Sequence, residues 1–594
     1  MRKHNFNLLL CWLFGAWLIV HLPLSANAQD AVCEASREAN IWLSRPYSDD
    51  TSIIRIMAIT TDAPTTKLTV IDQQGERSSL STRSRGGPPW SLIAQWQAPT
   101  NDTYRIELQR DDQPIACREV TVSMTDAPPR LQSWNLASEA FYSAWIEELF
   151  GLPLEENLNV SSLEPLLRDQ ERNFLHNYLG QNEDLRLPLT PDCADLPYTL
   201  RAYFAWKTGL PFAYRACNRG SGNSPPKCGS PSLITEFIRS ASSQASFKKL
   251  SRQLADTVHS GSARTGLADE ATDYYPVPLS RETLWPGTIF ADPYGHILVL
   301  VEWVPQTADR PGMLLAVDAQ PDNSVARKRV WEGTALFANT ANAGPGFKAF
   351  RPIVATASGN WRGLSNQELS EQFDFAPFSL EQAQLTPDDF YATLTQLINP
   401  KGLNPLQAYE AMLAALIEQL ETRVNSVNNG EVYSRRNPRS LITMPDKAAI
   451  FQTVGPWEDY ATPSRDMRLL IAINVLEDLP DKILRHPELF VLNGRDPQRA
   501  SDELTQHHAK RIREHTIRYT RTDGSTWELS IADILARKPA FEAAYNPNDC
   551  VEFRWGALPD SEEYTSCNRR APAAQRAKME QYRIWFREMR RPVY

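Results

Sequence analysis

The sequence predicts a protein of several domains: an N-terminal β-sandwich, a central α+β domain and a mainly helical C-terminal domain. The chain has 594 residues, which is too long for one hydrophobic core. Short strand-like runs fill the first part of the chain, strand and helix patterns share the middle, and long amphipathic helices follow Pro377. The expected boundaries are residues 29–126, 131–376 and 378–594.

Residues 1–28 have the pattern of a cleaved export signal. A basic start precedes an apolar run from Phe6 to about Leu24, and Ala26-Asn27-Ala28 fits the small-x-small rule of signal peptidase. We therefore expect cleavage after Ala28 and a periplasmic or secreted mature chain, with an uncleaved membrane anchor as the alternative. No later run is apolar for long enough to span a bilayer, so we expect no membrane span after cleavage.

The N-terminal domain is predicted from short apolar runs that turn formers separate. The expected strands are residues 52–61, 67–73, 91–98, 103–110 and 118–124. Turn signals such as Gly86-Gly87-Pro88-Pro89 lie between them, and evenly spaced short strands of this kind predict a β-sandwich. The phrase NDTYRIEL resembles the late strand of bacterial immunoglobulin-like modules, and this resemblance implies binding or spacing rather than catalysis.

Helical patterns flank strand patterns at about 285–355. The expected helices are residues 140–151, 162–180, 405–427 and 466–479. We expect the third of these to end near Asn428-Asn429-Gly430. The fourth has Thr462 as a cap and Pro463 as its first position.

The cysteines indicate a disulfide framework with one thiol left over. The sequence has 8 cysteines, and loss of the signal removes Cys11, which leaves an odd number. Exported chains meet oxidising conditions, so the others are expected to pair. The predicted disulfides are Cys33–Cys117, Cys217–Cys228 and Cys550–Cys567. Cys193 remains, and it is either a reactive thiol or a small buried apolar side chain.

Cys193 lies where a helix is expected to start. Asp192 can cap a helix that begins at Cys193. Because Pro197 would kink such a first turn, the alternative is a helix that starts near Asp195, with Cys193 just before it. In both cases the sulfur lies near a helix N-terminus, whose field lowers the pKa of a thiol, whereas the two aspartates raise it. Gly209 is expected to end the helix.

A hairpin of two buried strands is predicted farther along the chain. The runs HILVLVEWV (296–304) and MLLAVDA (313–319) are apolar on both faces, and the segment between them is polar and rich in turn formers. An antiparallel pair is therefore expected.

The register of this hairpin decides whether His296 meets Asp318. If Trp303 pairs with Met313, His296 and Asp318 become diagonal neighbours on one face, about 7–8 Å apart at the backbone. A slip of one residue would place them on different faces.

An imidazole beside a carboxylate is the base and its orienting partner in a catalytic triad. We predict that Cys193 is a nucleophile, that His296 takes its proton and passes one to the leaving amine, and that Asp318 holds the imidazole. The backbone N–H of Cys193 is expected to meet the oxyanion. The alternative interpretation is structural: a buried cysteine, a core histidine and a turn aspartate.

The order of these residues resembles that of the papain-like superfamily of thiol enzymes. DCADLPYTLRAYFAWKTGLPF and PGTIFADPYGHILVLVEW resemble motifs of its NlpC/P60 branch, while GHILVLVEW and LLAVDAQP are similar to the His and Asp strands of its transglutaminase-like branch. Pieces within roughly 187–330 carry the resemblance. It implies a papain-like fold for the central domain, the catalytic set Cys193, His296 and Asp318, and no cofactor. It also implies cleavage or transfer of amide and peptide acyl groups through a thioester, on cell-wall peptides or envelope proteins.

Other kinds of function are less favoured by the sequence. The net charge is -9 and no basic block stands out, so we expect no nucleic-acid partner. Glu503, His507, His508 and His515 give no full set of metal ligands on one helical face, so we expect no metal. A non-catalytic envelope binding or scaffold protein that kept the fold is the alternative function. The sequence leaves the oligomeric state open.

One further segment, VGPWEDYATPSRDMR, groups Trp457 and Tyr460 with Arg465 and Arg468. Aromatic and charged side chains together can bind a glycan or a peptide. A loop packed on the next helix is the commoner arrangement, and we give it preference.

Overall fold

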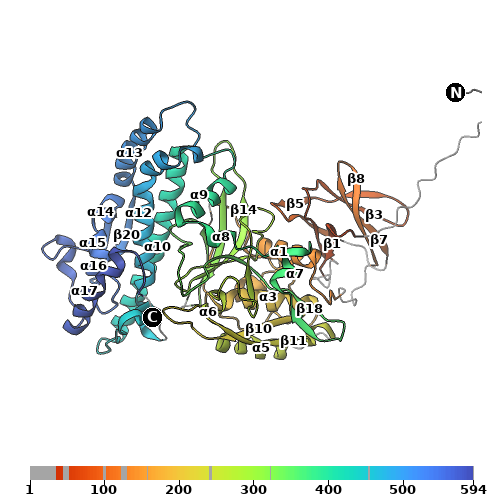
Figure 1. Ribbon diagram of the computed structural model, residues 1–594, viewed down its shortest axis with the longest axis horizontal. Helices are drawn as coiled ribbons and strands as arrows, with labels where there is room; N and C mark the ends of the chain where they lie inside the picture. The colour runs from red at the N-terminus through yellow and green to blue at the C-terminus, as the bar shows by residue number, and fades with distance from the viewer. Residues whose placement is uncertain are drawn as a thin grey trace, which may run out of the picture.

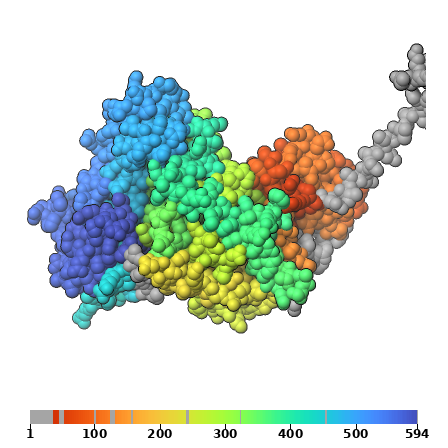
Figure 2. All heavy atoms as spheres, viewed as in Figure 1, coloured from red at the N-terminus to blue at the C-terminus, as the bar shows by residue number. Residues whose placement is uncertain are grey.

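The computed structural model describes residues 35–44, 53–97, 102–121, 130–154, 156, 158–239, 244–320, 323–451 and 455–592. Along these ranges a strand-rich N-terminal region, a central region of sheet and helices, and a helical C-terminal region follow one another (Figure 1). In Figure 2 the blue C-terminal region lies directly against the green and yellow central region. The multidomain prediction is thus confirmed at this level. The predicted signal peptide, residues 1–28, lies outside the described residues.

The N-terminal region consists of two four-stranded antiparallel sheets. The first has the order β1-β2-β6-β5, with β1 Ala39–Leu43, β2 Ile53–Thr60, β6 Trp90–Gln97 and β5 Thr82–Arg85. The second has the order β4-β3-β7-β8, with β4 Arg77–Ser79, β3 Lys67–Ile71, β7 Thr103–Arg110 and β8 Gln113–Thr121. Apolar residues of both sheets, such as Ile56 and Ile106, form one buried cluster.

Strand β8 begins earlier than the pattern at 118–124 predicts. Asp111 and Asp112 both have positive φ, 49° and 60°, as a two-residue hairpin turn of type I′ requires. Pairing with β7 therefore starts at once, with Arg110 opposite Gln113.

The central region is built on a seven-stranded sheet with the order β12-β17-β13-β14-β15-β16-β9. Its strands are β12 Tyr274–Pro276, β17 Gly346–Phe350, β13 Ile289–Ala291, β14 Ile297–Val304, β15 Met313–Ala319, β16 Val325–Arg329 and β9 Asn159–Val160. Helices α1 (Leu136–Phe150) and α3 (Asp195–Thr208) share a core with one face of β14. Helix α9 (Pro387–Ile398) packs on the other face through Phe390. The centre of the sheet is thus buried on both sides, which explains why β14 and β15 are almost continuously apolar.

Strands β14 and β15 form the predicted antiparallel hairpin with one irregularity. At the turn end Trp303 pairs with Leu314 rather than with Met313, because the register shifts by one residue inside β14. Beyond the shift Val299 pairs with Val317, which is the register that the prediction required. A bulge of this kind leaves no clear signal in a run that is apolar on both faces.

The predicted helix at 162–180 is much shorter in the structure. Helix α2 covers only Glu164–Arg168. Beyond it Asn173 turns the chain, because its side chain donates to the carbonyl of Leu167 at 2.7 Å and accepts from the N–H of Leu175 at 3.0 Å. Asparagine competes for backbone groups in this way, and here it outweighs the apolar periodicity.

Smaller elements complete the central region. They are β10 Phe212–Cys217, β11 Cys228–Ile234, α4 Glu236–Arg239, α5 Gln244–Thr257, α6 Ser260–Ala263, β18 Ile353–Ala355, β19 Trp361–Gly363, α7 Asn366–Glu371 and α8 Glu381–Gln384.

The C-terminal region has its own core between long helices and a small hairpin. Its elements are α10 Pro405–Arg436, η1 Lys447–Phe451, α11 Pro456–Tyr460, α12 Pro463–Arg485, η2 Pro487–Leu489, α13 Pro497–Glu514, β20 Thr516–Thr520, β21 Thr526–Ser530, α14 Ile531–Ala536, α15 Lys538–Phe541, α16 Val551–Arg554, η3 Glu562–Ser566 and α17 Ala573–Arg587. Helix α10 runs through Gly430, where the sequence predicts its end. Gly430 lies close to Arg554 and Tyr460, so tertiary packing holds the helix together there.

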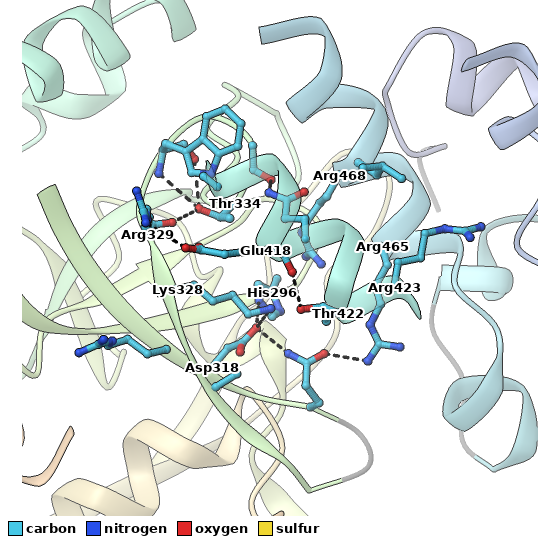
Figure 3. A pocket seen from close by; sticks show the side chains of 18 residues that line it. His296, Asp318, Lys328, Arg329, Thr334, Glu418, Thr422, Arg423, Arg465 and Arg468 are labelled. Atoms are coloured by element: carbon cyan, nitrogen blue, oxygen red, sulfur yellow. Dashed lines mark hydrogen bonds and ion pairs between the residues drawn. The ribbon is translucent and has the colours of Figure 1, made fainter. Parts of the chain in front are cut away.

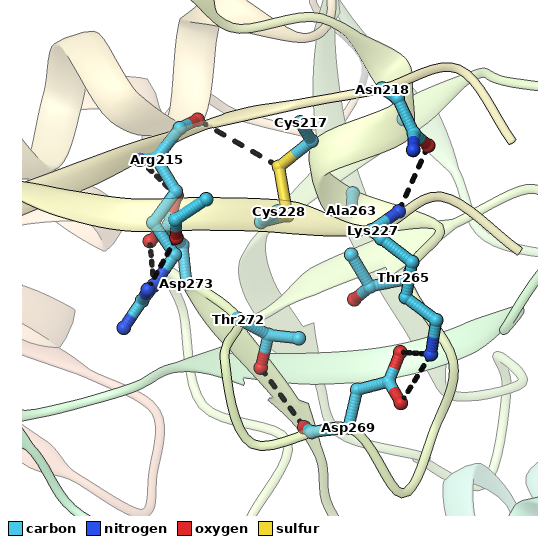
Figure 4. Close-up of a disulfide and its surroundings, with 12 residues drawn as sticks. Arg215, Cys217, Asn218, Lys227, Cys228, Ala263, Thr265, Asp269, Thr272 and Asp273 are labelled. Carbon is cyan, nitrogen blue, oxygen red and sulfur yellow. Dashed lines mark hydrogen bonds and ion pairs between the residues drawn. A yellow bond between two sulfur atoms is a disulfide. The ribbon is translucent and has the colours of Figure 1, made fainter.

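Two of the three predicted disulfides are confirmed. Cys217–Cys228 joins β10 to β11, as Figure 4 shows, and Cys550–Cys567 closes a loop of the C-terminal region. Cys117 is disulfide-bonded as well, and its predicted partner Cys33 lies outside the described residues. Disulfides fit an oxidising compartment. Within the described ranges no helix is both long enough and apolar enough to cross a membrane.

Candidate active site

The thiol of Cys193 lies immediately before helix α3. The helix begins at Asp195, so the second of the two predicted arrangements is the observed one. The carboxylate of Asp192 accepts hydrogen bonds from the N–H groups of Ala194 and Asp195, at 2.7 and 2.9 Å, and so fixes this turn. Pro197 falls in the first turn, where a missing N–H removes no intrahelical bond.

The imidazole of His296 is placed by a tight turn between β13 and β14. The N–H of Asp292 donates to the carbonyl of His296 at 2.8 Å, and the N–H of Gly295 donates back to Asp292 at 3.0 Å. Gly295 has a φ of 104°, and a Cβ atom there would lie 2.9 Å from the hydroxyl of Ser260. Glycine therefore both permits the turn and makes room beside the site.

His296 and Asp318 form a direct pair on one face of the hairpin. Nε2 of His296 lies 3.0 Å from Oδ2 of Asp318, and the carboxylate is fully buried. The same oxygen also forms an ion pair with Nζ of Lys328 at 3.1 Å and accepts a hydrogen bond from Nε2 of Gln320 at 2.6 Å. A pocket on this side of the pair is lined by His296, Asp318 and Lys328. Figure 3 shows these side chains meeting there, with Arg465 and Arg468 reaching in from a helix of the C-terminal region.

These contacts decide which nitrogen of His296 is basic. Burial raises the pKa of Asp318, but the charge of Lys328 and the hydrogen bond from His296 outweigh burial and hold that pKa below its usual range. The carboxylate is therefore ionised and can only accept hydrogen bonds. It follows that Nε2 of His296 carries a proton and that Nδ1 keeps the lone pair.

Cys193 and His296 line one cavity of about 610 Å³, which we call the Cys193 cavity. A backbone hydrogen bond from Ile297, the residue after His296, acts on the sulfur of Cys193. The opposite wall comes from the C-terminal region, with Trp457, Arg465 and Arg468 among its residues. The cavity thus lies between two regions of the chain.

The thiol and the imidazole are both neutral at rest. Burial, and after it the charge of Asp192, raises the pKa of the Cys193 thiol. Burial and the charge of Arg468 lower the pKa of His296 to about 4, against the opposing effect of Asp318. At neutral pH the pair therefore holds no thiolate and no imidazolium. A reaction at the sulfur therefore needs a base that takes the thiol proton.

The structure brings the three predicted residues together with others that the sequence does not place at the site. Gln320 and Lys328 support Asp318, and Arg465 and Arg468 face the site from α12. The aromatic and charged composition of the segment around Trp457 is compatible with ligand binding, but the sequence favours a packed loop there. Its position against residues far away in the sequence could not be read from composition.

No family model, curated protein sequence or solved structure matches this chain. The geometry of the site and the residues that form it are therefore the basis for a functional proposal.

Proposed function

We propose that the protein is an exported thiol enzyme of transglutaminase-like or NlpC/P60-like type. It cleaves or transfers amide and peptide acyl groups through a thioester on Cys193, on cell-wall peptides or envelope proteins. One observation carries the proposal: Cys193 and His296 line the same cavity, and Asp318 fixes the imidazole so that Nδ1 is the base.

The proposal includes a papain-like fold for the central region and an immunoglobulin-like fold for the N-terminal sheets. Support for the first comes from helix α3, which carries the thiol at its N-terminus and shares a core with the sheet that carries His296 and Asp318. Support for the second comes from the two antiparallel sheets around one buried cluster.

The reaction begins when the sulfur of Cys193 attacks the carbonyl carbon of an amide and Nδ1 of His296 takes the thiol proton. The resulting oxyanion meets the backbone N–H of Cys193. The C–N bond then breaks, and the imidazolium returns its proton to the departing amine, which leaves a thioester. Water or a second amine attacks the thioester and gives a proton to His296. The C–S bond breaks, so that an acid or a new amide leaves and the thiol takes its proton back.

A non-catalytic envelope binding protein is the second candidate. The observation that favours it is the neutral pair, because most activated cysteines have a lowered thiol pKa, whereas the pKa of Cys193 is raised. Such a protein would keep the cavity and bind peptides without forming a thioester.

Alkylation distinguishes the two candidates. We expect iodoacetamide to modify Cys193 in the native protein, and His296→Gln to slow this modification by at least roughly tenfold, because the thiol loses its base. The modified peptide is measured by mass spectrometry. His259→Gln is the matched control, since His259 lines the same cavity but its Nε2 contacts the carbonyl of Cys217.

The same variants are then tested on peptidoglycan and on envelope peptides. The wild type should release an amine or a peptide fragment, and Cys193→Ala should release none. An added amine that appears in the product indicates transfer rather than hydrolysis. If Cys193 stays unmodified and Cys193→Ala matches the wild type on every substrate, the protein is not a thiol enzyme.

A further inference from the structure

Positive charge gathers in the Cys193 cavity, chiefly on the side that the C-terminal region supplies. Among the described residues that line it, Arg219, Arg465, Arg468 and Arg591 are cationic at neutral pH, and Asp192 and Glu458 are the carboxylates. Burial and the charge of Asp192 raise the pKa of Glu458 to about 7, so it is partly protonated at neutral pH. The cavity therefore favours an anionic occupant.

Arg468 is the arginine whose charge reaches the reacting groups. Burial has the largest effect on the pKa values of Cys193 and His296, and the charge of Arg468 acts on both as well. Its side chain is 19% exposed, and its ion pair within the described chain is with Asp292, at 3.5 Å. That distance is at the limit of a hydrogen bond. A guanidinium has five N–H donors, so it can bind a closer anion without giving up Asp292.

Arg465, one helical turn before Arg468, links α12 to Asp318 through Gln320. Its Nη2 donates to Oε1 of Gln320 at 2.9 Å, and Nε2 of Gln320 donates to Asp318 at 2.6 Å. These hydrogen bonds hold helix α12, and with it the backbone of Arg468, against the strand that carries Asp318.

We propose that the Cys193 cavity accepts an acyl donor with a carboxylate close to the bond that breaks, and that Arg468 recognises this carboxylate. The inference rests on the proposed function, because it assumes an amide substrate at Cys193. A guanidinium can bind a carboxylate through two parallel N–H···O hydrogen bonds. These bonds fix the orientation of the carboxylate in addition to attracting its charge. In a peptide such a group is either the terminal α-carboxylate or an acidic side chain.

Two reagents of nearly equal size test the charge preference. Iodoacetate and iodoacetamide both alkylate a thiol, with loss of iodide, but iodoacetate carries a carboxylate. We expect the ratio of their rates at Cys193 to fall by roughly tenfold in Arg468→Gln. The ratio is the readout because loss of the Arg468 charge also raises the thiol pKa and slows both reagents. Arg485→Gln removes the same charge from the exposed far end of α12 and should leave the ratio unchanged.

A binding measurement works even if the thiol is inert. The Cys193→Ala protein is titrated calorimetrically with N-acetylalanine, with the α-amide of N-acetylglutamic acid, and with N-acetylalanine amide. The first two present an α- and a side-chain carboxylate, and the third is neutral. We expect one or both acids to bind, the neutral amide to bind at least roughly tenfold more weakly, and Arg468→Gln to remove the difference.

The outcomes separate the two proposals. If Cys193 reacts with neither reagent but the acids bind through Arg468, the thiol chemistry is wrong and the carboxylate site stands. If Cys193 reacts and the rate ratio and the binding are the same in Arg468→Gln, the carboxylate site is wrong and the thiol chemistry stands. Tighter binding of inorganic phosphate than of either acid would also overturn the assignment.

Discussion

Asp318 holds three donors on a single buried oxygen, and this arrangement controls the chemistry of His296. His296, Gln320 and Lys328 all contact Oδ2, while Oδ1 is buried without a hydrogen-bond partner. An ionised acceptor of this kind fixes the imidazole tautomer and raises the basicity of its other nitrogen. In the proposed reaction Asp318 acts through His296, which makes it a positioning residue.

Replacing Asp318 by asparagine tests this role. Asp318→Asn keeps the size of the side chain but removes its charge, so the tautomer is no longer fixed and the His296 base becomes weaker. We expect the rate of Cys193 alkylation by iodoacetamide to fall by roughly a hundredfold. Asp273→Asn is the control, since Asp273 is another buried carboxylate of the central region and accepts from Tyr198 at 2.8 Å. It should lower the melting temperature without lowering the alkylation rate. Equal rates in the two variants would contradict the assignment.

At the scale of single residues, local patterns predicted one half of the site. The odd number of cysteines identified Cys193 as the unpaired thiol. The pair of His296 and Asp318 was predicted from a hairpin whose two strands are near each other in sequence. No local pattern placed Arg468 at this site, because the residues it meets there lie much earlier in the chain. The packing of one region on another brings such residues together, and the periodicity of a sequence does not predict that packing.

The start of helix α3 carries two opposing effects on the thiol. Asp192 organises the turn by accepting from two backbone N–H groups, yet its charge raises the pKa of Cys193. An asparagine at this position keeps the accepting oxygen and removes the charge.

Asp192→Asn should therefore lower the pKa of the Cys193 thiol. The thiol reacts as the thiolate, so the plot of alkylation rate against pH should move to lower pH by roughly one unit. Thermal stability should change little, because both backbone hydrogen bonds remain. Asp192→Ala is the comparison variant, because it removes both the charge and the oxygen that accepts the backbone hydrogen bonds. It should therefore also reduce the free energy of unfolding by about 1 kcal/mol. A plot that does not move would show that the charge of Asp192 does not set the thiol pKa.

At the scale of elements, the predictions succeeded where one pattern dominated and failed where side chains competed. The long helices α10 and α12 and the hairpin β14–β15 follow their periodicity. The expected helix at 162–180 is cut short by Asn173, and the hairpin absorbs a one-residue shift that a two-sided apolar strand cannot reveal. Both departures come from specific contacts rather than from average propensity.

At the scale of the whole molecule, the C-terminal region forms one wall of the candidate site and is not an independent domain remote from it. Helix α12 reaches Gln320 and Asp292 of the central region, and Gln419 of α10 donates to the carbonyl of Gly333 at 3.0 Å. The sequence predicted a helical domain but assigned it no role at the site. Its contribution depends on docking against residues that directly follow strands β13 and β15, which no local motif encodes.

The last described residues of the chain reinforce this docking beside the thiol. Arg591 donates to the carbonyl of Tyr294 at 2.6 Å and to the hydroxyl of Ser464 at 2.9 Å. It therefore joins the turn before His296 to the start of α12, and it lines the Cys193 cavity. Loss of this link should widen the entrance to the cavity.

Arg591→Ala is accordingly expected to admit larger reagents. Iodoacetamide and a fluorescein-linked iodoacetamide share one reaction but differ in size, so the ratio of their rates at Cys193 reports access rather than thiol chemistry. We expect the bulky reagent to gain several-fold in rate relative to the small one. Arg590→Ala is the matched control, because Arg590 is exposed and pairs with Glu588 on its own side of the chain. A parallel rise for both reagents would instead mean a change in thiol pKa, and unchanged rates for both would show that Arg591 does not restrict the entrance.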